Sequence, residues 1–185
     1  SLFVRAGNVT VSNSTITNTG QYVGPTYEDS NWQSGNEAPM GAIVVGDRSN
    51  GSAYEHSTAV ELSNTTVISQ KSEVPAIYTY QKGSEQVDRN VTINGGENAF
   101  VSGTVSNNGM TGLTITGGTF TDPQASAFID DTTSKVIETE DGVIVVPNTE
   151  GVTLDSNKQT LKVGESVVLH ATLTPEGAVE ELVWT

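Results

Sequence analysis

The sequence contains no cysteine and few basic residues. Without cysteine, the chain has no disulfides, no thiol nucleophile and no thiolate metal site. Lysine and arginine together number 8 against 22 acidic residues, which gives a formal net charge of -14. Binding to nucleic acid or to an anionic membrane surface needs clustered basic side chains, so we expect neither partner.

Long apolar runs and helical patterns are also lacking. No run approaches the roughly 18 residues that a membrane span needs, so we expect no membrane insertion. No window keeps apolar residues at helical spacing without an interrupting Gly, Asn or Thr. No charged-then-apolar signal segment begins at Ser1. We interpret the chain as a fragment, monomeric within a longer multidomain protein, whose targeting signals lie elsewhere.

Short alternating runs of Val, Ile and Thr fill the sequence and predict an all-β chain. Four segments share one pattern, an apolar-polar-apolar triplet followed by small polar residues and a further apolar residue. A second short apolar run precedes each of them and begins at Leu2, Ala42, Ala76 or Ala99. We therefore predict two short strands per repeat. The four segments are "NVTVSNSTI" (8–16), "AVELSNTTV" (59–67), "NVTINGGENAF" (90–100) and "GLTITGGTF" (112–120).

Repeats that cannot bury a face alone bury it by stacking, which predicts a solenoid. Val, Ile and Phe would point inward, Thr and Asn outward, and Asn or Gly would occupy the bends. The alternative is a sandwich of antiparallel hairpins, because Asn-Gly pairs occur at Asn50, Asn94 and Asn108. Recurrence of one unit in one order favours the solenoid. We interpret the glycosylation-like sequons as products of a fold rich in Asn and Thr; they begin at Asn8, Asn13, Asn50, Asn64 and Asn90.

This repeat pattern resembles the right-handed parallel β-helix of pectate-lyase-like extracellular proteins, over residues 1–129 with insertions at 21–41 and 47–58. Asp122 and Pro123 are the residue types favoured at the N-cap and N1 positions of a helix, so we expect a short helical turn to begin there. Residues 130–147 then predict a capping hairpin around Asp141-Gly142. This succession is similar to the closing segment of β-helix surface proteins from Gram-positive gut bacteria. The resemblance implies an extracellular protein, either secreted or associated with the cell wall.

Residues 148–151 have the composition of a linker, and residues 152–185 resemble the first half of a bacterial immunoglobulin-like domain of group 2. The resemblance implies a truncated β-sandwich with Trp184 in its core and 183–185 as its third strand. It also implies a spacer within a large surface or secreted protein. The matching residues are Val152, Leu154, Leu161, Val163, Gly164, Glu165, Leu169, Ala171, Thr172, Pro175, Val183, Trp184 and Thr185.

The two insertions carry aromatic rings beside acids and amides, the combination that sugar binding uses. We predict that they meet on one side of the solenoid, because both leave it at neighbouring coils. A carboxylate pair there would instead permit glycoside hydrolysis. The predicted ligand-binding residues are Tyr22, Tyr27, Arg48, Trp32, Tyr54 and His56. The candidate catalytic acids are Glu28, Asp29, Glu37, Asp47 and Glu55.

Three functions remain open: a non-catalytic module that binds a glycan or a host surface, part of a β-helix glycoside hydrolase, and a structural stalk. The absence of a recognisable acid pair favours the first. We predict no cofactor and no His-rich metal site, because His56 and His170 are the only histidines and His170 has the pattern of a solvent-facing strand residue. Calcium needs only oxygen ligands; its candidates are Glu28, Asp29, Asp47, Asp130 and Asp131.

Overall fold

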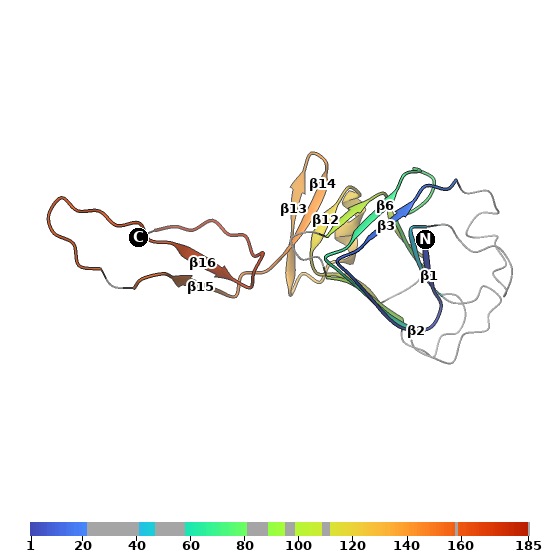
Figure 1. Cartoon of the computed structure of the whole chain (residues 1–185), viewed down its shortest axis with the longest axis horizontal. Coiled ribbons are helices and arrows are strands. Elements are labelled where there is room, and N and C mark those ends of the chain that lie inside the picture. Colours follow the sequence, from blue (N-terminus) through green and yellow to red (C-terminus); the bar gives the residue numbers. More distant parts are fainter. Residues whose placement is uncertain are drawn as a thin grey trace.

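A computed structural model describes residues 1–21, 41–46, 58–80, 89–94, 99–108, 112–157 and 159–184. Strands hold 51% of these residues, so the all-β prediction is confirmed. Within the same ranges the one helical element is a short 3-10 helix, η1 (Pro123–Phe128). A body of sheets lies at one end of the molecule, and a narrow two-stranded ribbon extends from it (Figure 1). No helix in the described ranges has the length and hydropathy of a membrane span.

Twelve strands of the body form three sheets in which these strands are all parallel. The first sheet contains β1 (Leu2–Val4), β4 (Ile43–Gly46), β7 (Ile77–Tyr80) and β10 (Val105–Asn108). The second contains β2 (Gly7–Ser12), β5 (Thr58–Ser63), β8 (Arg89–Asn94) and β11 (Gly112–Ile115). The third contains β3 (Thr15–Asn18), β6 (Thr66–Ser69), β9 (Phe100–Ser102) and β12 (Gly118–Phe120).

The chain visits the three sheets in the same order four times, so each repeat has three strands and the prediction of two was wrong. The fourth repeat begins at Val105, which pairs with Ile77, and not at Ala99 as predicted. Phe100, beside Ala99, pairs with Thr66 and so belongs to the third sheet. The antiparallel alternative fails for the strands that end at Asn94 and Asn108, because β8 and β10 pair in parallel.

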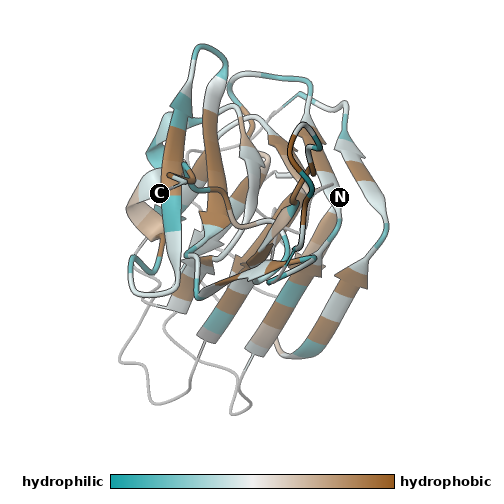
Figure 2. Ribbon diagram, turned by 90° about the vertical axis from the view of Figure 1, so that its left-hand side faces the viewer, coloured by the Kyte–Doolittle hydropathy of each residue, from teal (hydrophilic) through white to brown (hydrophobic). Residues whose placement is uncertain are grey.

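Equivalent residues of successive repeats stack inside the body as aliphatic ladders, which Figure 2 shows as bands of one hydropathy crossing neighbouring strands. Ile43 and Ile77 are fully buried in one ladder of the first sheet. Each such side chain contributes roughly 1.5–3 kcal/mol by leaving water. Two further ladders of this core are Val9, Val60, Val91 and Leu113, and Ile16, Val67, Val101 and Phe120.

One ladder of the first sheet changes from apolar to polar along the stack. Val4 and Val45 are followed at the same position by Thr79 and Asn107. Thr79 is fully buried, and its hydroxyl donates to Asn107 Oδ1 at 2.8 Å. This hydrogen bond satisfies the Thr79 hydroxyl, because burying that group without a partner would cost free energy.

In the first two repeats the bend between the second and third strands uses asparagine, as predicted. Asn13 and Asn64 have φ values of 49° and 50°, a left-handed conformation that asparagine adopts more readily than most residues. Their side chains stack, and Asn64 Nδ2 donates to Asn13 Oδ1 at 2.6 Å. Two of the five sequons therefore serve bends, while Asn8 and Asn90 lie in β2 and β8.

The edge strands β10, β11 and β12 are each covered by the segment that follows β12. In the first sheet, Ile43 N donates to Ala76 O at 2.9 Å and Ile77 N donates to Thr104 O at 3.2 Å. Val105 N donates instead to Asp122 Oδ2, also at 2.9 Å. A carboxylate thus replaces the carbonyl of a further strand, while Asp122 Oδ1 caps η1 through Gln124 N at 3.1 Å.

The predicted hairpin is confirmed as β13 (Ser134–Thr139) and β14 (Gly142–Pro147). β14 pairs antiparallel with β12 and extends the third sheet to six strands. Ile129 forms a bridge with Ile115 of β11. The predicted roles of Asp122 and Pro123 at the start of η1 are confirmed as well.

The ribbon comprises residues 151–157 and 159–184, and its two strands, β15 (Gly151–Leu154) and β16 (Ala171–Thr174), pair antiparallel. No strand forms over 181–184, and Trp184 is 59% exposed, so the predictions of a third strand and of a buried Trp184 were wrong. A lone pair of strands has no opposing layer against which a tryptophan could pack. An ion pair between Lys135 and Glu180 joins the ribbon to β13.

Candidate functional site

The predicted ligand-binding and catalytic residues lie in the two insertions, outside the described residues. They are Tyr22, Tyr27, Glu28, Asp29, Trp32, Glu37, Asp47, Arg48, Tyr54, Glu55 and His56. The structure does give the strands that the insertions connect. The first joins β3 to β4 and the second joins β4 to β5. They therefore leave two neighbouring repeats, as predicted, and flank the two ends of one strand, β4. β4 has four residues, so the Cα atoms at its two ends are about 10 Å apart.

Aromatic residues line the outward face of the first sheet beside β4. Phe3, Val44 and Tyr78 occupy one register position on three neighbouring strands. The rings of Tyr78 and Tyr80 stack with centroids 5.7 Å apart and an interplanar angle of 22°. A Cβ on Gly46 would collide with the Tyr80 ring, so glycine is needed at this position. Val44, Tyr78 and Tyr80 form a buried cluster distinct from the main core.

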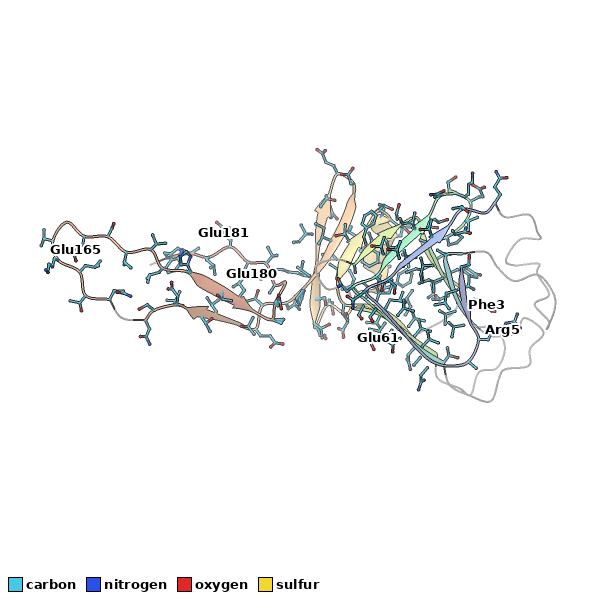
Figure 3. The ribbon with its side chains drawn as sticks, in the orientation of Figure 1. Phe3, Arg5, Glu61, Glu165, Glu180 and Glu181 are labelled. Carbon is cyan, nitrogen blue, oxygen red and sulfur yellow. The ribbon has the colours of Figure 1, made fainter. Side chains whose placement is uncertain are left out.

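Phe3 and Arg5 are the more accessible part of this face (Figure 3). Phe3 is 36% exposed, and Arg5 Cζ lies 4.7 Å from the centroid of its ring. Arg5 Nε is buried and has no hydrogen-bond partner. The guanidinium group thus lies over the Phe3 ring, and the pair suits a ligand that has both apolar C–H groups and oxygen acceptors. Sequence reasoning did not select either residue, since "LFVRA" was assigned only to the repeat.

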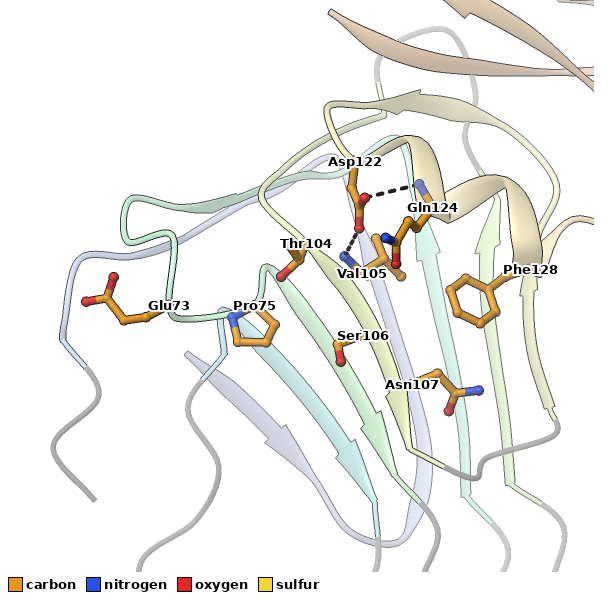
Figure 4. A pocket seen from close by; sticks show the side chains of 9 residues that line it. All are labelled: Glu73, Pro75, Thr104, Val105, Ser106, Asn107, Asp122, Gln124 and Phe128. Carbon is orange, nitrogen blue, oxygen red and sulfur yellow. Dashed lines mark hydrogen bonds between the residues drawn. The ribbon is translucent and has the colours of Figure 1, made fainter. Parts of the chain in front are cut away.

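A hollow lies at the opposite edge of the first sheet, between β10 and η1 (Figure 4). Its volume is about 370 Å³, and its lining is Glu73, Pro75, Thr104, Val105, Ser106, Asn107, Asp122, Gln124 and Phe128. Both carboxylate oxygens of Asp122 accept backbone hydrogen bonds, as described above. The carboxylate of Asp122 therefore holds the covering segment in place.

The acids of the described residues do not form a metal centre. No three His, Asp or Glu side chains gather anywhere in the described ranges. Asp130, a calcium candidate, accepts hydrogen bonds at Oδ1 from the hydroxyl and backbone N–H of Thr132. These bonds hold the pKa of Asp130 below its ordinary value of 3.8. His170 is exposed, as predicted, although it lies just outside β16.

No family model, curated protein or solved structure matches this chain. Support for a binding site on the outward face of the first sheet, beside β4, therefore comes from geometry and chemistry alone.

Proposed function

We propose that the chain is part of a right-handed parallel β-helix that binds a glycan or host surface outside a bacterial cell. Four passes through three parallel sheets in one order support the β-helix. Right-handedness follows from the general rule for parallel crossovers, which holds in about 98% of cases. The repeat pattern resembles that of pectate-lyase-like extracellular proteins, and the closing segment resembles that of surface proteins from Gram-positive gut bacteria.

The observation that carries the binding proposal is the position of the insertions at the two ends of β4. A packed sheet is a rigid base, and loops attached to such a base are frequent binding elements. The residues beside β4 on the same sheet add the Phe3 ring and the Arg5 guanidinium group. Sugar rings stack on aromatic faces, and their hydroxyls bond to polar groups nearby.

Binding is a better proposal than hydrolysis for this site. Glycosidases need two carboxyl groups held about 5–10 Å apart. The residues named above on the outward face supply rings and a cation but no carboxylate; they are Phe3, Arg5, Val44, Tyr78 and Tyr80. We assign the acids of the insertions to hydrogen bonding with sugar hydroxyls and propose that the chain needs no cofactor.

Residues 152–185 belong, in this proposal, to an immunoglobulin-like spacer of a larger secreted or wall-attached protein. The antiparallel pairing of β15 and β16 supports a sandwich-type segment. The parent protein would present the glycan site away from the cell surface as one module of a monomeric multidomain chain.

A glycan-array screen of the chain tests the proposal, with Trp32→Ala and Tyr54→Ala measured in parallel. We expect selective binding by the parent chain and at least a tenfold loss in both variants. Trp184→Ala is the matched control, because Trp184 is an exposed tryptophan of the ribbon. An equal loss of glycan binding in Trp184→Ala would show that the losses in Trp32→Ala and Tyr54→Ala do not place the site in the insertions. Absence of binding by a folded parent chain would overturn the proposal and leave the stalk function.

A further inference from the structure

The outward face of the third sheet presents one continuous row of side chains across six strands. The inward neighbours in this sheet, such as Val67, Val101 and Phe120, are buried in the core. Because side chains alternate along a strand, the residues that precede them point outward. None of the residues in the row is buried. In register order the row is Thr15, Thr66, Phe100, Thr119, Ile144 and Ile137.

Phe100 lies near the middle of this row and is 37% exposed. Its neighbours in the row are Thr66 on β6 and Thr119 on β12. Neighbouring strands are about 4.8 Å apart, so the row extends over about 24 Å. An aromatic ring is thus held between two hydroxyl groups on a rigid surface, with Ile144 and Ile137 continuing the apolar area beyond Thr119.

The row is uncharged in a chain whose net charge is -14. It contains no Asp, Glu, Lys or Arg, and the next outward positions on β3, β6 and β9 are Thr17, Ile68 and Ser102. Lys135, the next outward position beside Ile137 on β13, forms an ion pair with Glu180. A charged partner would lose hydration here without gaining an opposite charge. The electrostatics therefore favour a neutral occupant.

A neutral saccharide matches the chemistry of this row. The C–H face of a sugar ring stacks on an aromatic ring, and each threonine hydroxyl offers one donor and two acceptor positions to sugar hydroxyls. A polysaccharide chain also repeats these two features along its length, as the row does across the strands.

We propose that the outward face of the third sheet, centred on Phe100, is a flat binding platform for a neutral polysaccharide. The chain of the polysaccharide crosses the strands, one sugar ring stacks on Phe100, and hydroxyls bond to Thr66 and Thr119. The inference rests on the proposed glycan binding for its ligand class, but it uses residues of another sheet.

Affinity measurements with four variants test the platform. The probes are cellulose, chitin, xylan and mannan as neutral polysaccharides, and polygalacturonate as an acidic one. We expect Phe100→Ala to weaken binding of at least one neutral probe tenfold or more, while Phe100→Trp retains it because a ring remains. Thr66→Val, which removes a hydroxyl at nearly constant volume, should weaken the same binding about threefold. Trp32→Ala in the first insertion is the fourth variant.

The outcomes separate this inference from the proposed function. Binding that is lost in Trp32→Ala but unchanged in Phe100→Ala overturns the platform and leaves the proposed function intact. Binding lost only in Phe100→Ala supports the platform and removes the insertions from the site. Binding of polygalacturonate alone, or of none of the five probes, overturns the platform. Phe100→Ala should still unfold in one cooperative transition, because the side chain is 37% exposed and lies outside the core.

Discussion

The three-sheet body and the two-stranded ribbon use the same side chains with opposite results. Val60 and Leu62 alternate with polar residues on β5 and are each 2% exposed. Val152 and Leu154 alternate in the same way on β15 but are 50% and 43% exposed. β5 lies between two parallel neighbours and faces the other sheets, whereas β15 has one neighbour and no opposing layer. Alternation of apolar residues with other residues therefore specifies a strand. The apolar side chains become buried only where that strand packs against other sheets.

The comparison is tested most strongly by truncating one aliphatic residue in each region. Ile77→Ala should destabilise the chain by about 2–5 kcal/mol, because it opens a cavity in a fully buried ladder. Leu154→Ala should cost less than about 0.5 kcal/mol, since its side chain has little packing to lose. Urea unfolding followed by circular dichroism measures both. Similar losses at the two positions would show that the ribbon has a packed core in solution.

A glycine pair makes the same comparison for the backbone. Gly142, at the start of β14, has a φ of 140°, and an added Cβ would collide with the Phe120 carbonyl oxygen. Gly164 in the ribbon has a φ of 94° with nothing within 4 Å of an added Cβ. We expect Gly142→Ala to cost about 3 kcal/mol and Gly164→Ala only about 1 kcal/mol. The difference between the two shifts in urea midpoint reports the collision of the added Cβ at residue 142 with the Phe120 carbonyl oxygen. Equal costs at the two positions would contradict that collision.

Removing the Asp122 carboxylate should weaken the covered end of the body. Asp122→Ala loses the cap of η1 and the partner of Val105 N, at a cost of about 1–2 kcal/mol. Hydrogen exchange should accelerate at the amide of Val105 and remain unchanged at Val152 in the ribbon. Unchanged exchange at Val105 would mean that another group replaces the carboxylate.

The smallest effect concerns pH and the entry to the hairpin. Hydrogen bonds from Thr132 lower the pKa of Asp130 in the folded chain, so their stabilisation is present above the ordinary value of 3.8 and is lost as pH falls through the lower folded pKa. Asp130→Asn should therefore be slightly less stable than the parent chain at neutral pH. The difference in unfolding free energy should shrink below pH about 4. A difference in unfolding free energy that grows as the pH falls would contradict the stabilisation of ionised Asp130 by Thr132.

Local chemistry predicted some elements well and the number of strands per repeat poorly. The Asp141-Gly142 hairpin and the Asp122-Pro123 cap need only neighbouring residues, and both are confirmed. In the first two repeats the third strand was missed because only two residues separate it from the second, Asn13 and Ser14 or Asn64 and Thr65, so the alternation reads as continuous. β10 was missed because Val105 is its only apolar residue.

The binding faces were harder to predict than the strands. Aromatic residues were expected to point inward, and Phe120 does, but Phe3 and Phe100 point outward. The side to which a residue points depends on register, and a shift of one position reverses it. Composition was enough to select the insertions, whereas the row around Phe100 becomes visible only when six strands are aligned.

The contact between Asp122 and Val105 has a consequence for the size of such molecules. Nothing in the repeated hydrogen bonding of the first sheet limits the number of repeats, since each strand offers its successor the groups that its predecessor offered. Growth stops where one side chain takes the place of a main-chain oxygen. Length is thus set where the covering segment begins, and a longer version could be engineered by inserting a complete repeat before Thr121 and leaving residues 122–147 unaltered.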